Sequence, residues 1–186
     1  FIEPRMDNTI HPNNPTYMRI HAERIGHYYD FDGWTGVGML NEGYFGMNIK
    51  SGAKYNFSVF FRSVEGNAKK VRVVLASKDN KVLAEKEINT NGAGWQKYNA
   101  ELTANADCKD ANLQILLLDK GNLDVDMVSL MPQDTYHGHG LRKDLAEALE
   151  ALHPQFMRFP GGCVVHGGGD GFWDTYRWKT TIGPKE

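Results

Sequence analysis

The chain has 186 residues, of which 41% are hydrophobic and 24% charged, and its formal net charge at pH 7 is −2. This length accommodates one domain of ordinary size and a remainder. The nearly balanced charge and the scattered Lys and Arg argue against a nucleic-acid partner, and no apolar run reaches the roughly 20 residues that cross a bilayer. We therefore expect neither a nucleic-acid nor a membrane partner.

The first segment, residues 1–16, has the composition of a connecting segment. It reads "FIEPRMDNTIHPNNPT" and contains three prolines and three asparagines. Its apolar residues follow neither the period of a strand nor that of a helix, and Pro and Asn favour turns and irregular backbone. We predict a linker or leading arm at residues 1–16.

Strand patterns dominate residues 17–132. In "KYNFSVFFRS" the apolar residues Tyr55, Phe57, Val59 and Phe61 alternate with mostly polar neighbours, which is the period of a half-buried strand. Similar patterns recur at 70–77 and 95–102, whereas 112–119 is apolar on both faces, as in a central strand. About eight short strands separated by turn residues favour a jelly-roll-like β-sandwich over 17–132.

The pattern changes to that of a helix after residue 132. Five apolar residues recur at helical spacing on one stripe: Leu141, Leu145, Ala148, Leu149 and Leu152. Asp144 lies in the first turn, where a negative charge complements the helix dipole, and Pro154 ends the helix.

A short strand, "QFMRFPGG" at 155–162, is expected next. A helix followed by a buried strand that ends in glycine is typical of a (β/α)8 barrel. A whole barrel needs roughly 250 residues, so residues 133–186 are expected to hold only its beginning. The predicted fold is mainly β: a jelly-roll-like sandwich followed by one helix and one strand of an incomplete (β/α)8 barrel.

Two distinctive motifs in this part carry a family resemblance. The run "SLMPQDTYHGHGLRKDLAEALEALHPQFMRFPGGCVVHG" and the later "YRWKTTIGPKE" closely resemble the α-L-arabinofuranosidases of glycoside hydrolase family 51. The upstream run "GVGMLNEGYFGMNIKSGAKYNFSVFFRS" is similar to the carbohydrate-binding-like sandwich embedded in the same enzymes. The resemblance covers roughly residues 34–186, with the motifs in the family's order.

The resemblance implies a glycosidase that releases terminal arabinofuranose from plant cell-wall arabinan and arabinoxylan with retention of configuration. That chemistry uses two carboxyl groups about 5–5.5 Å apart. In the family both are glutamates on later barrel strands, one of them in a "GNE" motif that these 186 residues lack. The resemblance therefore implies no catalytic residue in this chain, which we expect to be an inactive, non-catalytic front part. The alternative is an autonomous carbohydrate-binding module without a hydrolytic role.

The resemblance also indicates where sugar would be bound. The substrate-binding candidates are Arg158, Gly161, Gly162, Cys163, His166 and Trp178. The paired glycines allow a sharp turn and close approach of the backbone to a sugar, and by resemblance Cys163 lines the pocket for the terminal arabinose. Arg158 would bind pocket carboxylates or only tie barrel strands together. His166 replaces a glutamate of many family members.

Aromatic residues of the sandwich suggest a second glycan site. Trp178 in the tail and the aromatics of the sandwich either stack on sugar faces or pack in a core. We expect packing for Tyr44, Phe45 and Trp95. Tyr28, Tyr29 and Trp34, in or beside an irregular polar stretch, are the candidates for an exposed glycan platform.

No cofactor is predicted, and metal binding is limited to one candidate. Asp119, Asp124 and Asp126 cluster near the last sandwich strand. In sandwich carbohydrate-binding modules an aspartate placed like Asp126 often helps to bind a structural calcium ion, which needs six to eight oxygen ligands. The alternative is that these carboxylates cap turns or face water.

Partners and location follow from the implied substrate. We expect an arabinose-containing plant cell-wall polysaccharide or oligosaccharide as the ligand. Such polymers cannot enter cells, so a secreted or periplasmic protein is expected. The apolar side chains of the incomplete barrel lack their barrel neighbours, and self-association through residues 133–186 is one way in which they would be covered.

Overall fold

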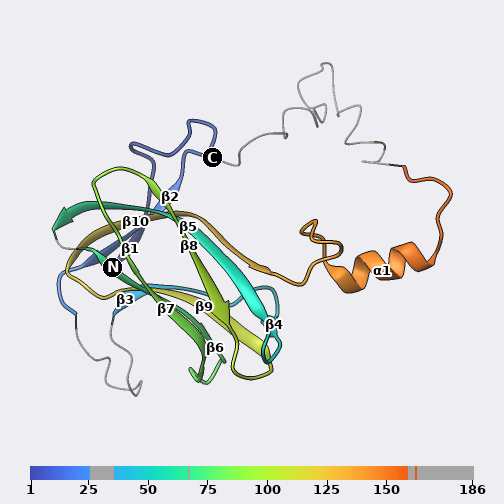
Figure 1. The fold of residues 1–186 in the computed structure, drawn as a ribbon. Helices are drawn as coiled ribbons and strands as arrows, with labels where there is room; N and C mark the ends of the chain where they lie inside the picture. Colours follow the sequence, from blue (N-terminus) through green and yellow to red (C-terminus); the bar gives the residue numbers. More distant parts are fainter. Residues whose placement is uncertain (26–35, 67, 159–161, 163–186) are drawn as a thin grey trace.

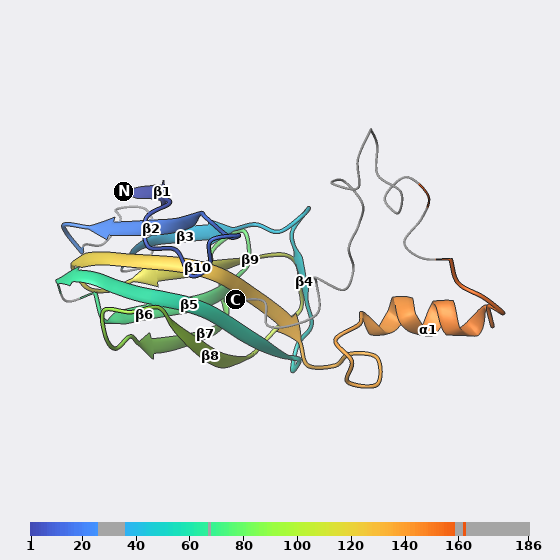
Figure 2. The ribbon, with the colours of Figure 1, turned by 90° about the horizontal axis from the view of Figure 1, so that it is seen from above.

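The described residues of the computed structural model, 1–25, 36–66, 68–158 and 162, form ten strands and one helix. The strands build two antiparallel sheets that pack face to face, and the helix lies beyond one end of them (Figures 1 and 2). The predicted mainly-β sandwich is therefore confirmed. The helix belongs to the beginning of the α/β unit that was expected after residue 132.

The strand order brings distant parts of the chain together. The first sheet has the order β1 (Ile2–Arg5), β2 (Tyr17–Ala22), β10 (Gly121–Pro132), β5 (Lys54–Gly66), β8 (Gln96–Thr103). The second has the order β3 (Val37–Asn41), β9 (Cys108–Leu117), β6 (Lys70–Ala76), β7 (Val82–Asn89), and β4 (Met47–Ile49) also pairs with β9. The central strands of both sheets are paired with neighbours on both sides.

The core follows from the alternation along the strands. Tyr55, Phe57, Val59 and Phe61 on β5 all point inward and are almost fully buried. They meet inward-facing residues of the second sheet, including Val71, Val73, Leu75, Leu113, Ile115 and Leu117. Burial of one such side chain contributes about 1.5–3 kcal/mol. The strand predicted as apolar on both faces is β9, which lies between β3 and β6.

The arm expected at residues 1–16 contains a strand that the pattern did not predict. Residues 2–5 pair with β2 as the edge strand β1, and the N-terminal amino group donates to the His21 carbonyl oxygen at 2.9 Å. Edge pairing uses backbone groups and leaves most side chains at least partly exposed, so it requires no regular apolar alternation.

Helix α1 (Lys143–Ala151) confirms the predicted helix, with Asp144 in its first turn. The predicted apolar stripe remains exposed: Leu145 and Leu149 on the helix, and Leu141 and Leu152 beside it, are each more than half accessible to solvent. Figures 1 and 2 show α1 standing apart from the sandwich, at the end of the segment that follows β10. No helix within the described ranges is both long and apolar enough to span a membrane.

The prediction of a strand beginning at residue 155 is wrong for residues 155–158, which are not extended in a sheet. A strand needs a neighbour that accepts and donates its backbone hydrogen bonds, and these residues pair with none of the described strands. Local apolar content alone therefore did not determine this element.

A buried carboxylate joins three strands on the outer face of the first sheet. Asp124 on β10 is fully buried. Its Oδ1 accepts from Arg19 Nε on β2 at 2.6 Å, and its Oδ2 accepts from Arg62 Nε and Nη2 on β5 at 2.8 and 2.6 Å. The hydrogen bonds to Asp124 raise the pKa of Arg19.

The leading arm and Trp95 cover this carboxylate. Arg62 donates from Nη1 to the Asn8 carbonyl oxygen at 2.6 Å, and Trp95 Nε1 donates to the same oxygen at 2.8 Å. The Arg62 guanidinium lies over the Trp95 ring, 4.7 Å from its centroid. Burial is the main reason that the pKa of Tyr17 beside them is raised. We call this group, Asp124, Arg19, Arg62, Tyr17, Trp95 and Asn8, the arm clamp.

Asp124→Asn is expected to destabilise the chain by about 3–5 kcal/mol, because the two guanidinium groups would keep their burial and lose the opposing charge. The amide has the shape of the carboxylate, so no cavity is created. Urea unfolding followed by tryptophan fluorescence measures the change. Asp144→Asn, in the exposed pair with Arg142, is the control and is expected to unfold like the parent. Equal midpoints for the two variants would contradict the role of the arm clamp.

Candidate functional site

Two of the six predicted substrate-binding residues lie in the described part of the chain. Arg158 is exposed, and its Nη2 atom lies 3.7 Å from the position that a Cβ would take at Gly162. Their roles in sugar binding stay predictions. Gly161, Cys163, His166 and Trp178 lie outside the described residues, so their roles stay predictions.

The predicted glycan platform also lies outside the described residues, because Tyr28, Tyr29 and Trp34 fall within 26–35. For the other aromatics the structure gives a direct outcome. Trp95 packs in the arm clamp as expected, edge-on to Tyr17 with 5.1 Å between ring centroids. The expected packing of Tyr44 and Phe45 is wrong, since both side chains are 89% exposed.

The three clustered aspartates have separate roles. Asp124 belongs to the arm clamp. Asp119 accepts from the backbone amides of Lys69 and Lys70 at 3.2 and 2.8 Å. Asp126 accepts from Asn14 Nδ2 at 3.0 Å and from the amide of Met127 at 2.7 Å.

These contacts are those of capping and bridging carboxylates, the alternative to calcium binding. Within the described ranges, no three His, Cys, Asp or Glu side chains lie close enough together to bind a metal ion. The sequence "HGH" places His137 and His139 two positions apart, but among the described residues no third ligand of these types joins them. A structural calcium ion at Asp126 stays a prediction.

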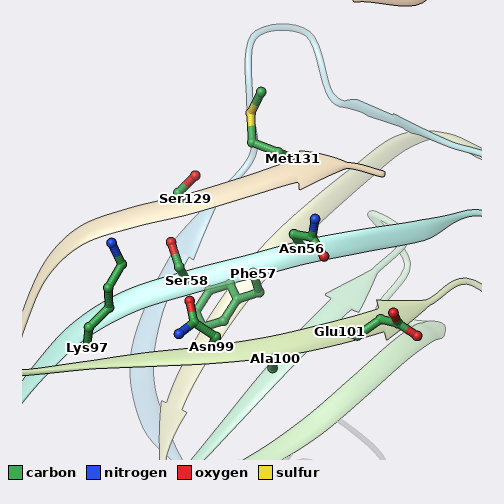
Figure 3. A pocket seen from close by; sticks show the side chains of 9 residues that line it. All are labelled: Asn56, Phe57, Ser58, Lys97, Asn99, Ala100, Glu101, Ser129 and Met131. Carbon is green, nitrogen blue, oxygen red and sulfur yellow. The ribbon is translucent and has the colours of Figure 1, made fainter. Parts of the chain in front are cut away.

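An open hollow of about 590 Å³ lies on the outer face of the first sheet, over β10, β5 and β8 (Figure 3). Four of its nine lining residues are polar and uncharged, Asn56, Ser58, Asn99 and Ser129, and the others are Lys97, Glu101, Met131, Phe57 and Ala100. Figure 3 shows the Ser58 and Ser129 hydroxyls and the Lys97 amine directed to the same side of the sheet.

Strand geometry explains why these groups meet. Residues two apart on a strand share a face, so Asn56 and Ser58 point outward while Phe57 points into the core. Cross-strand pairing sets Ser58 beside both Ser129 and Asn99. A register shift in β10 between Asp126 and Ser129 separates this row from the arm clamp, as a β-bulge re-aims the residues that follow it.

Two lining residues of the hollow, Asn56 and Glu101, belong to a hydrogen-bonded network. Gln133 Nε2 donates to Asn56 Oδ1 at 2.9 Å and to Glu101 Oε2 at 2.7 Å, and Lys54 Nζ lies 2.9 Å from Glu101 Oε1. The hydrogen bond from Lys54, followed by that from Gln133, lowers the pKa of Glu101. Glu101 therefore stays ionised and engaged in the network at neutral pH.

The polar lining side chains of the hollow can form hydrogen bonds. Amides and hydroxyls both donate and accept hydrogen bonds, which suits a neutral ligand with many hydroxyl groups. Glu101 is the single carboxylate among the lining residues, whereas glycoside hydrolysis uses two. Sequence reasoning missed this site because it looked for aromatic platforms. The polar outward positions of 56–58 and 97–101 were the available signal, but only sheet pairing brings them together.

Comparison with known proteins identifies the relatives of the chain. A family model described as "Alpha-L-arabinofuranosidase 1 domain" matches residues 148–186. Alpha-L-arabinofuranosidase 1 of Arabidopsis thaliana is 39% identical over 154 residues, which are 81% of this chain and 22% of that protein. The extracellular exo-alpha-L-arabinofuranosidase of Streptomyces chartreusis is also 39% identical, over 82% of this chain and 19% of its own length.

A solved structure extends the similarity to the fold. A family 51 α-L-arabinofuranosidase with bound arabinose matches 99% of this chain with a TM-score of 0.81 and 25% identity, over 30% of its own chain. The present chain thus spans about a fifth of the length of these two curated relatives. Over the part that it spans, in sequence and in fold, the chain belongs to the α-L-arabinofuranosidases of glycoside hydrolase family 51.

Proposed function

We propose that the chain is the front, non-catalytic part of a longer retaining α-L-arabinofuranosidase, which releases terminal arabinofuranose from plant cell-wall arabinan and arabinoxylan. The observation that supports this most is the similarity to α-L-arabinofuranosidases over about four fifths of the chain. The catalytic glutamates would then lie in the part of the protein that corresponds to the remaining length of the relatives. The Arg158–Gly162 segment would form one wall of the arabinose pocket.

Location and partners follow from the same proposal. The Streptomyces chartreusis relative is an extracellular enzyme by name. A polymeric substrate outside the cell requires an exported protein, so we propose secretion or export to the periplasm. The ligand class is an arabinose-containing plant cell-wall polysaccharide or oligosaccharide.

The longer protein is expected to release 4-nitrophenol from 4-nitrophenyl α-L-arabinofuranoside, whereas the 186-residue chain is expected to release none above the uncatalysed rate. The reason is that retaining hydrolysis needs both a nucleophile and an acid/base carboxyl group. Absorbance of the released phenol measures the activity, and NMR of the first-formed arabinose tests retention of its anomeric configuration. Hydrolysis by the 186-residue chain would contradict its non-catalytic role, and an inactive longer protein would contradict the arabinofuranosidase assignment.

A second candidate function is carbohydrate binding by the sandwich itself, and the hollow on β10, β5 and β8 favours it. Its lining provides two side-chain amides and two hydroxyls on one open face. A polysaccharide chain could lie along such a face without entering an enclosed pocket. Binding there would hold the polymer near the enzyme and needs no catalytic group in the chain.

The double variant Asn56→Ala/Asn99→Ala is expected to abolish retardation of the 186-residue chain in native gels that contain soluble arabinoxylan or arabinan. The change removes amide donors and acceptors from the hollow and leaves the inward-facing core untouched. Asn89→Ala, an exposed amide on β7 of the other sheet, is the control and should run like the parent.

Two outcomes separate the sites. Loss of retardation in Tyr28→Ala or Trp34→Ala, with the hollow variant unaffected, would place the glycan at the platform that the sequence predicted. A parent chain that no plant-wall glycan retards would remove carbohydrate binding as a function of the sandwich. Neither outcome bears on the hydrolysis test.

A further inference from the structure

Loop 42–46, between β3 and β4, carries two exposed aromatic residues at its end. We call this pair, Tyr44 and Phe45, the aromatic tip. Asn41 pairs with Leu113 and Met47 pairs with Ala111 on the same neighbouring strand. The five residues of loop 42–46 thus lie between two pairing positions that are only two residues apart on β9. The loop is longer than this distance requires, so it protrudes from the sheet edge. Both aromatic side chains on it are 89% exposed.

The conformation of the tip is set by the backbone. Phe45 has a φ of 59°, a left-handed value that is unfavourable for a bulky residue, and Gly43 and Gly46 on either side have φ of 68° and 88°. The Gly43 amide donates to Asn41 Oδ1 at 2.8 Å. A Cβ at Gly46 would lie 2.6 Å from Asp110 Cα, so glycine permits the loop to press against β9.

Loop 42–46 thus holds two large aromatic rings in water. Burial of either ring would be favourable, and backbone strain persists where the position of a side chain matters. The rings contact each other at 4.5 Å between centroids and at 67° between planes. They present a corner, which fits a pocket in a protein surface better than the flat face of a sugar.

The tip lies at the end of the sandwich where the chain leaves β10. Beyond β4, the Ser51 amide donates to Asp107 Oδ1, and Gly52 donates to the Ala104 carbonyl oxygen. Lys54 follows, and its carbonyl oxygen accepts from the Gln133 amide at 2.9 Å, just where the chain leaves β10. Figures 1 and 2 both show β4 at the end of the sandwich that is nearer to α1.

Helix α1 carries a second exposed apolar surface at this side of the molecule. No residue of α1 is buried. The match to the arabinofuranosidase domain begins within α1, at residue 148. The solved relative with the same fold is more than three times as long as its matched part. The tip and α1 thus lie toward the same end of the described structure, where the chain enters the segment that matches this domain (Figures 1 and 2).

We propose that the Tyr44–Phe45 tip docks into a pocket of the α-L-arabinofuranosidase domain that begins within α1, and so sets the angle between that domain and the sandwich. The inference rests on the proposed function, because it requires the longer protein. Aromatic anchors commonly dominate the energy of such contacts, and an anchor that is already rigid loses less conformational entropy on docking.

Hydroxyl-radical labelling read by mass spectrometry tests the contact directly. In the 186-residue chain Tyr44 and Phe45 are expected to react far faster than the buried Phe57. In the longer protein their reactivity is expected to fall to near that of Phe57, while Met6, which is 69% exposed on the leading arm, serves as the exposed reference. Full reactivity of both rings in the longer protein would overturn the proposal.

The double variant Tyr44→Ser/Phe45→Asn removes the rings and keeps the loop, because Asn tolerates left-handed backbone. In the longer protein, proteolytic cleavage between residues 133 and 142 is expected to accelerate at least about tenfold, as undocking exposes this link. Met6→Ser is the matched control and should cleave at the parent rate. Equal rates for both variants would overturn the proposal.

Other occupants give distinct results. A glycan-dependent gel shift that the double variant loses, without protection of the rings in the longer protein, would make the tip a sugar platform. A dimer of the 186-residue chain that is lost in the double variant, again without protection of the rings in the longer protein, would make the tip a self-association site. Both results overturn the docking proposal. Hydrolysis of the aryl arabinofuranoside is measured separately. Protected rings in an inactive longer protein would contradict the activity assignment and leave the docking proposal supported.

Discussion

The ion pairs of the Asp124 carboxylate are the interactions that hold the outer face of the first sheet together. This carboxylate is fully buried and receives hydrogen bonds from Arg19 and Arg62, so it ties β2, β10 and β5 together through side chains as well as backbone. Charged groups remain in such a place only when they are paired and hydrogen-bonded. The arm clamp satisfies this condition, with Asn8 and Trp95 as its cover.

This arrangement divides one sheet face into two regions with different properties. Arg62 and Phe60 on β5 lie toward the covered half, whereas Asn56 and Ser58 lie in the open hollow. The bulge of β10 between Asp126 and Ser129 marks the boundary. A single strand thus supplies the core with its odd-numbered residues and supplies both a structural cluster and a candidate binding surface with its even-numbered ones.

The hollow and the Tyr44–Phe45 tip both lie toward one end of the sandwich. Gln133, just after β10, donates hydrogen bonds to Asn56 and Glu101 in the lining of the hollow. The Tyr44–Phe45 tip protrudes near the same end, and the chain continues from there toward α1 and the segment that matches the arabinofuranosidase domain. In the two proposals made above, the sandwich presents a glycan through the hollow and fixes the orientation of a neighbouring domain through the tip.

The sequence by itself determined the elements whose apolar spacing matches their burial. The alternation of β5 and β6, the two-sided apolar character of β9 and the stripe of α1 all predicted their structures, because periodicity reports which face of an element avoids water. Two motifs were also enough to identify the family. Only the tertiary structure decided the rest: that residues 2–5 form an edge strand, that 155–158 form none, that Tyr44 and Phe45 are exposed, and that Asn56, Ser58, Asn99 and Ser129 share one surface. These outcomes depend on which strands pair and in which register, and pairing between residues up to about a hundred positions apart leaves no local period in the sequence.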